Sequence, residues 1–200
     1  NRLDYTIENT VNTSLGGVAS ARRFDSGGLR SGQTSINLDM RRDLDIDIGK
    51  SVSFAFGGEY RNENYKIVAG ELQSYVNGPF SATPFKAAGG SQVFPGFRPA
   101  NETDLSRDSF AGYAELDADL TDQLTLQLAG RYEHFSDFGD TINGKAAARY
   151  EVIDGIAVRG SISTGFRAPS LAQQSFAATS TNNVGGVLIE VGTFPVSSPV

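Results

Sequence analysis

The feature that most constrains the fold is an unbroken two-residue alternation between residues 156 and 167. The even positions include Ile156, Val158 and Ile162, whereas the odd positions include Arg159 and Arg167. A period of two places the two sets on opposite faces of a β-strand. Because one face is apolar and the other carries arginines, this strand suits a wall between an apolar medium and water.

The same alternation recurs along most of the chain. It is found in segments near residues 2–8, 36–41, 52–63, 110–120, 124–133 and 142–152. Together with the segment described first, these predict about seven strands joined in simple succession. The expected fold class is all-β, an antiparallel up-and-down meander.

The predicted connections fall into two kinds. Residues 121–123 and 153–155 are tight turns, whereas the stretches 14–33, 68–106 and 172–200 read as long loops. In an up-and-down chain the two kinds lie on opposite rims, which is typical of outer-membrane barrels with their long loops outside the cell. The strand lengths also suit the ~9–11 residues of a tilted membrane strand. We therefore expect residues 1–200 to be a fragment of one transmembrane β-barrel domain, about seven strands of a larger barrel.

Composition argues against several functional classes. The net charge of -6 disfavours nucleic-acid binding, and the absence of cysteine excludes disulfides and thiolate metal sites. No phosphate-binding loop or nucleophile elbow is present, and the single histidine, His134, falls on the outward parity near a rim. We expect no catalytic residue, no cofactor and no metal. Asp43, Asp45 and Asp47 alternate, but the apolar residues between them favour a strand or turn over a calcium loop.

Arg42 breaks the pattern because it falls on the apolar parity of its segment. An arginine facing lipid at the bilayer midplane costs about 2–4 kcal/mol, and this cost falls to near zero at the interface. Two arrangements would avoid the cost. In the first, Arg42 lies at the turn-side rim and residues 43–51 form a longer turn. In the second, a β-bulge resets the parity.

In a large barrel the water-facing parity lines the interior, and the long loops cover the entrance. Ligand-contact candidates on the wall near the loop rim are Arg61, Glu63, Arg131, Glu133 and Arg167. The loop 68–106 adds Phe97 and Arg98, together with other aromatic residues suited to stacking on a sugar or chelate. The alternative is that arginines and glutamates on neighbouring strands pair with one another, which we favour for Arg131, Glu133 and Arg149.

Four passages resemble the barrel of TonB-dependent outer-membrane receptors. They are Ser-Thr-Gly-Phe-Arg-Ala-Pro-Ser at 163–170, Phe-Gly-Gly-Glu-Tyr-Arg-Asn-Glu at 56–63, the Gly-Arg-Tyr-Glu strand within 128–139, and Ala-Ala-Arg-Tyr at 147–150. The resemblance, judged from the order and spacing of these passages, covers about residues 34–171.

The resemblance implies a barrel filled by an N-terminal plug that imports a scarce nutrient, such as an iron chelate, cobalamin or an oligosaccharide. It also implies four partners: outer-membrane lipids, the rest of the barrel and the plug, the TonB energising complex reached through the plug, and an extracellular small molecule. We expect the chain to be a mid-barrel segment without the plug domain.

Two other readings remain open. A passive porin-like barrel would have the same wall without a plug. A soluble β-sandwich binding module would bury the apolar parity against a second sheet. Many apolar-parity residues are small, Gly112, Ala114 and Ala118 among them, so that a sandwich core would be thin.

Overall fold

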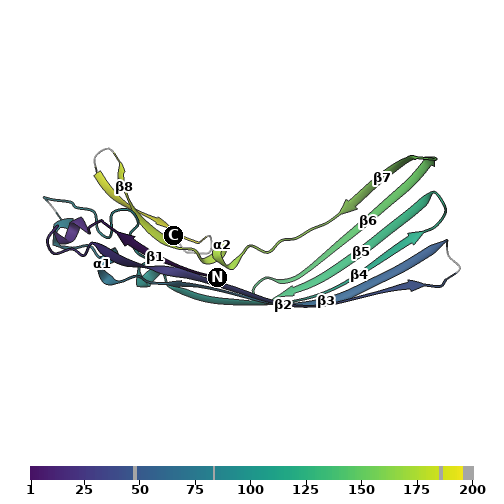
Figure 1. The fold of residues 1–200 in the computed structure, drawn as a ribbon, viewed down its shortest axis with the longest axis horizontal. Coiled ribbons are helices and arrows are strands. Elements are labelled where there is room, and N and C mark those ends of the chain that lie inside the picture. The colour runs from purple at the N-terminus through teal and green to yellow at the C-terminus, as the bar shows by residue number, and fades with distance from the viewer. Residues whose placement is uncertain (47–48, 83, 185–186, 196–200) are drawn as a thin grey trace. The chain divides into compact units, whose positions relative to one another are not determined.

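A computed structural model describes residues 1–46, 49–82, 84–184 and 187–195. Seven strands form one sheet in chain order, which confirms the expected meander (Figure 1). The strands are β1 (Arg2–Glu8), β2 (Arg23–Leu44), β3 (Ser51–Val68), β4 (Thr103–Asp119), β5 (Leu124–Phe135), β6 (Gly139–Ile153) and β7 (Ile156–Ser163). A separate antiparallel hairpin pairs β8 (Ala178–Val184) with β9 (Val187–Thr193).

The helical elements are short. They are α1 (Leu72–Tyr75), α2 (Leu171–Ser175) and the 3-10 turns Thr13–Leu15, Pro79–Ser81 and Pro99–Asn101. Within the described ranges, none of the helices has the length and apolar character required to cross a membrane.

Backbone proximity divides the chain into two compact units. The wall unit comprises residues 33–62 and 107–168, and the loop unit comprises residues 1–32, 63–106 and 169–200. Strands β2, β3 and β4 contribute residues to both units.

In the wall unit, side chains that are paired across neighbouring strands point to the same face of the sheet. The register between β4 and β5 and between β5 and β6 runs without a shift, so that Asp119, Thr125 and Arg149 lie in one row. The opposite face carries exposed aliphatic residues, including Ile142 at 81% and Ile162 at 77% exposure. Within the described part of the wall unit no second sheet packs on these side chains, as a β-sandwich would require.

The stretch 14–33 is not all loop, because β2 already begins at Arg23 and pairs with β1. Its glycines permit close approach to both neighbouring strands, β1 and β3. Gly27 has a φ of 85°, and a Cβ there would collide with the carbonyl oxygen of Val68. A Cβ at Gly28 would lie 2.6 Å from the carbonyl oxygen of Leu3. Glycine enrichment therefore marks close backbone approach inside a sheet here rather than a flexible connection.

The stretch 172–200 also differs from the expected loop, since it contains most of α2 and the β8–β9 hairpin. Helix α2 starts in a capping box, in which the Ser170 hydroxyl accepts from the Gln173 amide N–H and the Gln173 side chain accepts from the Ser170 amide N–H. Such short polar signals are easily missed in a segment rich in serine, threonine and asparagine. The third stretch lies between the end of β3 at Val68 and the start of β4 at Thr103, and it holds α1 and two of the 3-10 turns.

The structure places Arg42 near the turn-side end of β2, which ends at Leu44. Strand β3 begins at Ser51, so the connection between them is slightly shorter than the turn expected from residue 43. This is the rim arrangement, in which an outward arginine costs little. Asp47, the third carboxylate of the weighed calcium loop, lies outside the described residues.

The buried core of the loop unit is a cluster of Tyr65, Ile67, Phe97 and Leu171. Partly buried side chains surround it, among them Tyr5, Leu29, Phe94 and Phe176. The core therefore joins residues from β3, the long loop and α2, which are distant in sequence.

Candidate ligand-contacting surfaces

A charged network lies on the water-facing side of the wall unit, with Glu59 of β3 at its centre. Glu59 accepts hydrogen bonds from Arg61 on its own strand and from Nη2 of Arg131 at 2.8 Å. Nε of Arg131 also donates to Glu133 at 3.2 Å. The two glutamate side chains are only 14% and 13% exposed, whereas the two arginine side chains are 33% and 31% exposed. The network therefore presents guanidinium groups to water and covers its carboxylates.

Arg131 reaches Glu59 across the intervening strand β4. The guanidinium carbon of Arg131 lies 5.6 Å from the ring centre of Tyr113 on β4, a cation–π distance. The Tyr113 hydroxyl donates to Asp39 of β2. Gly57 leaves room for this ring, because a Cβ at Gly57 would lie 2.5 Å from the Tyr113 hydroxyl. The parity of the strands thus brings side chains of four strands together on one face.

Arginine–glutamate pairs are present, but they form within one strand or across an intervening strand, not between neighbouring strands as the sequence suggested. Arg131 pairs with Glu59 and Glu133, and Arg149 pairs with Glu151 on its own strand at 3.0 Å. These pairs are consistent with a wall-stabilising role. Contact between Arg61, Arg131 or Glu133 and a ligand stays a prediction.

The two remaining candidates that the sequence placed on the wall are Glu63 and Arg167. Glu63 is half-buried and belongs to the loop unit. Arg167 is exposed, follows the end of β7 and has no ion-pair partner among the described residues. Both stay candidates for ligand contact.

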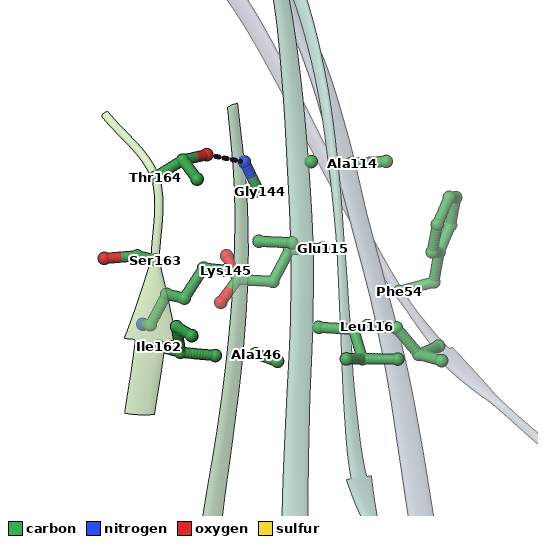
Figure 2. Close-up of a pocket in the computed structure, with 13 residues that line it drawn as sticks. Phe54, Ala114, Glu115, Leu116, Gly144, Lys145, Ala146, Ile162, Ser163 and Thr164 are labelled. Carbon is green, nitrogen blue, oxygen red and sulfur yellow. Dashed lines mark hydrogen bonds between the residues drawn. The ribbon is translucent and has the colours of Figure 1, made fainter. Parts of the chain in front are cut away.

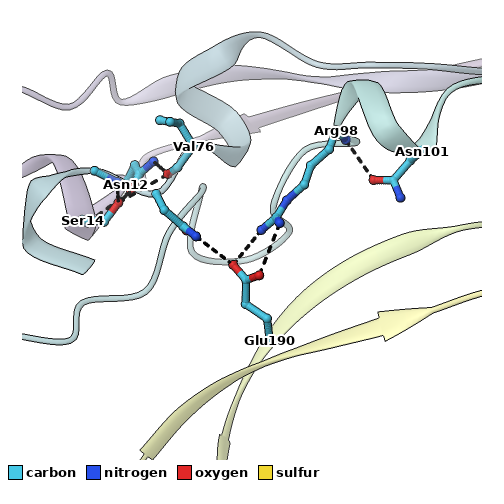
Figure 3. Close-up of polar contacts among 8 residues, drawn as sticks. Asn12, Ser14, Val76, Arg98, Asn101 and Glu190 are labelled. Atoms are coloured by element: carbon cyan, nitrogen blue, oxygen red, sulfur yellow. Dashed lines mark hydrogen bonds and ion pairs between the residues drawn. The ribbon is translucent and has the colours of Figure 1, made fainter. Parts of the chain in front are cut away.

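Phe97 and Arg98 are engaged within the loop unit. Phe97 is 3% exposed, and its ring packs against Phe94 at 5.4 Å and Tyr5 at 6.0 Å. Its ring therefore packs in the core and offers no open stacking surface, contrary to the role predicted for it. Arg98 forms a two-pronged contact with Glu190 of β9, at 2.7 Å and 3.3 Å (Figure 3).

Asn77 adds a third hydrogen bond to Glu190 at 3.2 Å. The hydrogen bond from Arg98, followed by smaller favourable contributions against a burial cost, lowers the pKa of Glu190 from its usual value of 4.5. Glu190 thus fastens the β8–β9 hairpin to the long loop while its carboxylate is ionised.

The aromatic residues that the long loop does expose are Phe80 and Phe85. They are 39% and 67% exposed, and their rings meet edge-to-face at 5.3 Å. This pair offers the stacking surface that the sequence analysis expected from the loop.

A buried arginine at the start of β4 was missed by the sequence analysis. Arg107 is 2% exposed and makes a bidentate contact to Asp137, with distances from 2.7 to 2.9 Å. Its guanidinium carbon also lies 5.0 Å from the Phe138 ring centre and 5.9 Å from that of Phe135. Phe166, within the Gly-Phe-Arg-Ala-Pro passage, packs on both of these rings. The sequence signal for Arg107 was its odd position, which places it on the water-facing parity. That position does not reveal that the side chain is buried.

A hollow of about 660 Å³ lies largely on the apolar side of the wall unit, where small residues leave space between larger ones (Figure 2). Ala114, Gly130 and Ala146 line it beside Leu128 and Ile162. Its polar contacts are few, one being the Gly144 amide N–H that donates to the Thr164 hydroxyl at 2.9 Å. A lining of this kind suits hydrocarbon chains better than a charged ligand.

His134 lies on the outward parity near the end of β5, where its Nδ1 is 2.7 Å from Asp140. The Tyr132 hydroxyl donates to the same carboxylate at 2.6 Å. Within the described ranges, no group of three or more histidine and acidic side chains could hold a metal ion.

Comparison with known proteins agrees with this architecture. Residues 1–193 match the family model for the TonB dependent receptor-like β-barrel. No curated protein matches significantly. Among solved structures, the siderophore receptor PirA from Acinetobacter baumannii is similar, with a TM-score of 0.59 and 10% sequence identity. The match covers 97% of this chain and 26% of that chain, so the chain spans about a quarter of the length of this receptor.

At this identity the structural likeness shows a shared fold, and the family model independently covers nearly the whole chain. The two-faced meander, with its charged water-facing network and exposed apolar side, is what such a barrel wall requires. The chain therefore belongs to the TonB-dependent receptor-like β-barrel family and forms part of its barrel.

Proposed function

We propose that the full-length protein is an outer-membrane importer that takes up a scarce nutrient through a plugged β-barrel. The observation that carries this proposal is the family match over residues 1–193 on a sheet with one apolar and one charged face. The proposed partners are outer-membrane lipids, the rest of the barrel and its plug, the TonB energising complex and an extracellular small molecule.

An iron chelate is the substrate class that we would test first. The similar protein PirA is a siderophore receptor, and its identity of 10% to this chain supports the common fold. Cobalamin and oligosaccharides, the other two nutrient classes, belong in the same test. In the loop unit, the exposed pair Phe80 and Phe85 is the proposed contact surface for the ligand. In the wall unit, Arg61 and Arg131, whose side chains are 33% and 31% exposed, are separate candidates.

Uptake of labelled iron chelates, cobalamin and oligosaccharides by cells expressing the protein would test this function. We expect uptake of one class in cells with an active TonB complex and none after the complex is deleted. Uptake that persists without TonB would instead support the passive porin-like barrel and overturn the proposal.

The contact residues need a separate measurement. Replacing Phe80 with alanine should weaken ligand binding by about 3- to 10-fold, the range expected for one aromatic stacking contact. The matched control is Val93→Ala in the same loop, because Val93 is 79% exposed and lies outside the aromatic pair. Equal affinities for the two variants would remove Phe80 from the site.

A further inference from the structure

The turn-side end of the wall unit brings two arginines face to face. Arg149 of β6 is paired directly with Arg159 of β7 in the sheet register. Side chains at directly opposed positions have Cβ atoms about 4.5–5.5 Å apart, and like charges there destabilise a sheet. Both residues lie on the water-facing parity, so this arrangement calls for a neutralising group.

The described residues neutralise only one of the two charges. Glu151 pairs with Arg149 at 3.0 Å, whereas Arg159 is exposed and has no ion-pair partner in the described part of the chain. Lys145, on the same face of β6, donates to the neutral side chain of Gln127 at 2.6 Å. The Gln127 amide in turn donates to Glu115 of β4, which links Lys145 to a carboxylate. Arg159 therefore lacks a counter-charge among the described residues.

Besides Glu151, the acidic side chains on this face include Asp117 and Asp119 of the far strand β4. Asp119 accepts hydrogen bonds from the hydroxyls of Ser51 and Thr125, each at 2.7 Å. Asp117 lines the same groove but is separated from β7 by the width of three strand spacings, about 14 Å. Neither carboxylate forms an ion pair with Arg159 in the described part of the chain.

A groove of about 610 Å³ lies between these cations. Lys145, Arg149 and Arg159 border it, and the small residues Ala147 and Ser161 leave its floor open. A guanidinium fork matches the paired oxygens of a carboxylate or a phosphate. The groove therefore combines space, unbalanced positive charge and suitable donors.

We propose that Arg149, Arg159 and Lys145 form an anion-binding site on the water-facing side of the wall, which accepts a carboxylate or a phosphate. The site rests on the barrel assignment and is independent of the imported nutrient. Its occupant is either a soluble anion or a carboxylate of the same protein inside the barrel. The chemistry of recognition is the same for both.

The test uses the protein at its cellular length in detergent, with inorganic phosphate as the probe. Phosphate binding is measured by ³¹P NMR at constant ionic strength, and thermal unfolding by circular dichroism in chloride buffer. The variant is Arg159→Gln. The matched control is Arg42→Gln, which removes one exposed arginine on the other parity near the same rim.

A soluble occupant predicts that the wild type binds phosphate and that Arg159→Gln weakens binding about ten-fold or more, while the control matches the wild type. An internal carboxylate predicts no phosphate binding and a lower Tm for Arg159→Gln than for the control. Two results would overturn the site: phosphate binding that is equal in both variants, or no binding together with a Tm for Arg159→Gln that equals or exceeds the control. If Arg159→Gln does not fold, Arg159→Lys replaces it, because lysine keeps the charge and loses the fork.

Discussion

Replacing Arg107 with methionine should increase how often the turn that joins β5 to β6 opens. The guanidinium group of Arg107 is almost fully buried and holds Asp137 through both carboxylate oxygens. Methionine keeps most of the apolar stem and removes the charge. The change therefore isolates the ion pair and its aromatic surroundings from simple loss of volume.

The cost follows from what is left behind. Removing one partner of a buried ion pair costs about 3–5 kcal/mol when the other charge cannot reach water. Asp137 is 30% exposed and can be partly rehydrated, which places the cost at the low end, about 3 kcal/mol. Since about 1.4 kcal/mol corresponds to a factor of ten, the turn should open about 100 times more often.

Amide hydrogen exchange measures this opening. The Ser136 amide N–H donates to the Asp108 carbonyl at 2.9 Å and should report it directly. Arg23→Met is the control, because the Arg23–Glu8 pair is 75% and 52% exposed and should contribute less than about 1 kcal/mol. Exchange at Ser136 that rises less than three-fold in Arg107→Met would refute the reasoning.

Three further predictions concern the wall and the hairpin. Gly57→Ala should destabilise the wall by about 1–3 kcal/mol in denaturant unfolding, because the new methyl group would lie 2.6 Å from a backbone oxygen of β2. Leu128→Arg should make the free energy of folding into lipid vesicles about 2–4 kcal/mol less favourable, because Leu128 is on the apolar face in the middle of β5. Glu190 has a lowered pKa in the folded protein. The stability that its ionised carboxylate gives to hairpin attachment should therefore be complete above pH 4.5 and be lost as the pH falls further. Hydrogen exchange of the β9 amides measures this loss.

Each of these has a matched control. Gly112→Ala should be neutral, since a Cβ at Gly112 would meet nothing within 4 Å. Ala129→Arg, next to Leu128 on the water-facing parity, should fold as well as the wild type. Glu190→Gln should remove the acid dependence of β9 exchange. A control that behaves like its test variant, or an acid response that persists in Glu190→Gln, would contradict the corresponding argument.

Much of the wall could be predicted because strand geometry is local. A period of two assigns each residue to a face whatever its neighbours are, so Leu128 and Arg131 could be placed on opposite faces before the structure was known. The tight turn at 121–123 and the long loop after Val68 follow from local sequence in the same way. Strand starts inside glycine-rich sequence could not be predicted, because Gly27 and Gly28 are required by the closeness of another backbone.

The linear pattern alone determined that this chain builds a two-faced meander and that its charged face carries Arg61, Arg131 and Glu133. Only the tertiary structure decided which charges meet, because Arg131 reaches Glu59 across an intervening strand. It also decided that Phe97 is buried and that Arg159 faces Arg149. The physical reason is that side-chain parity is a property of one strand, whereas pairing and burial depend on the register and approach of segments distant in sequence.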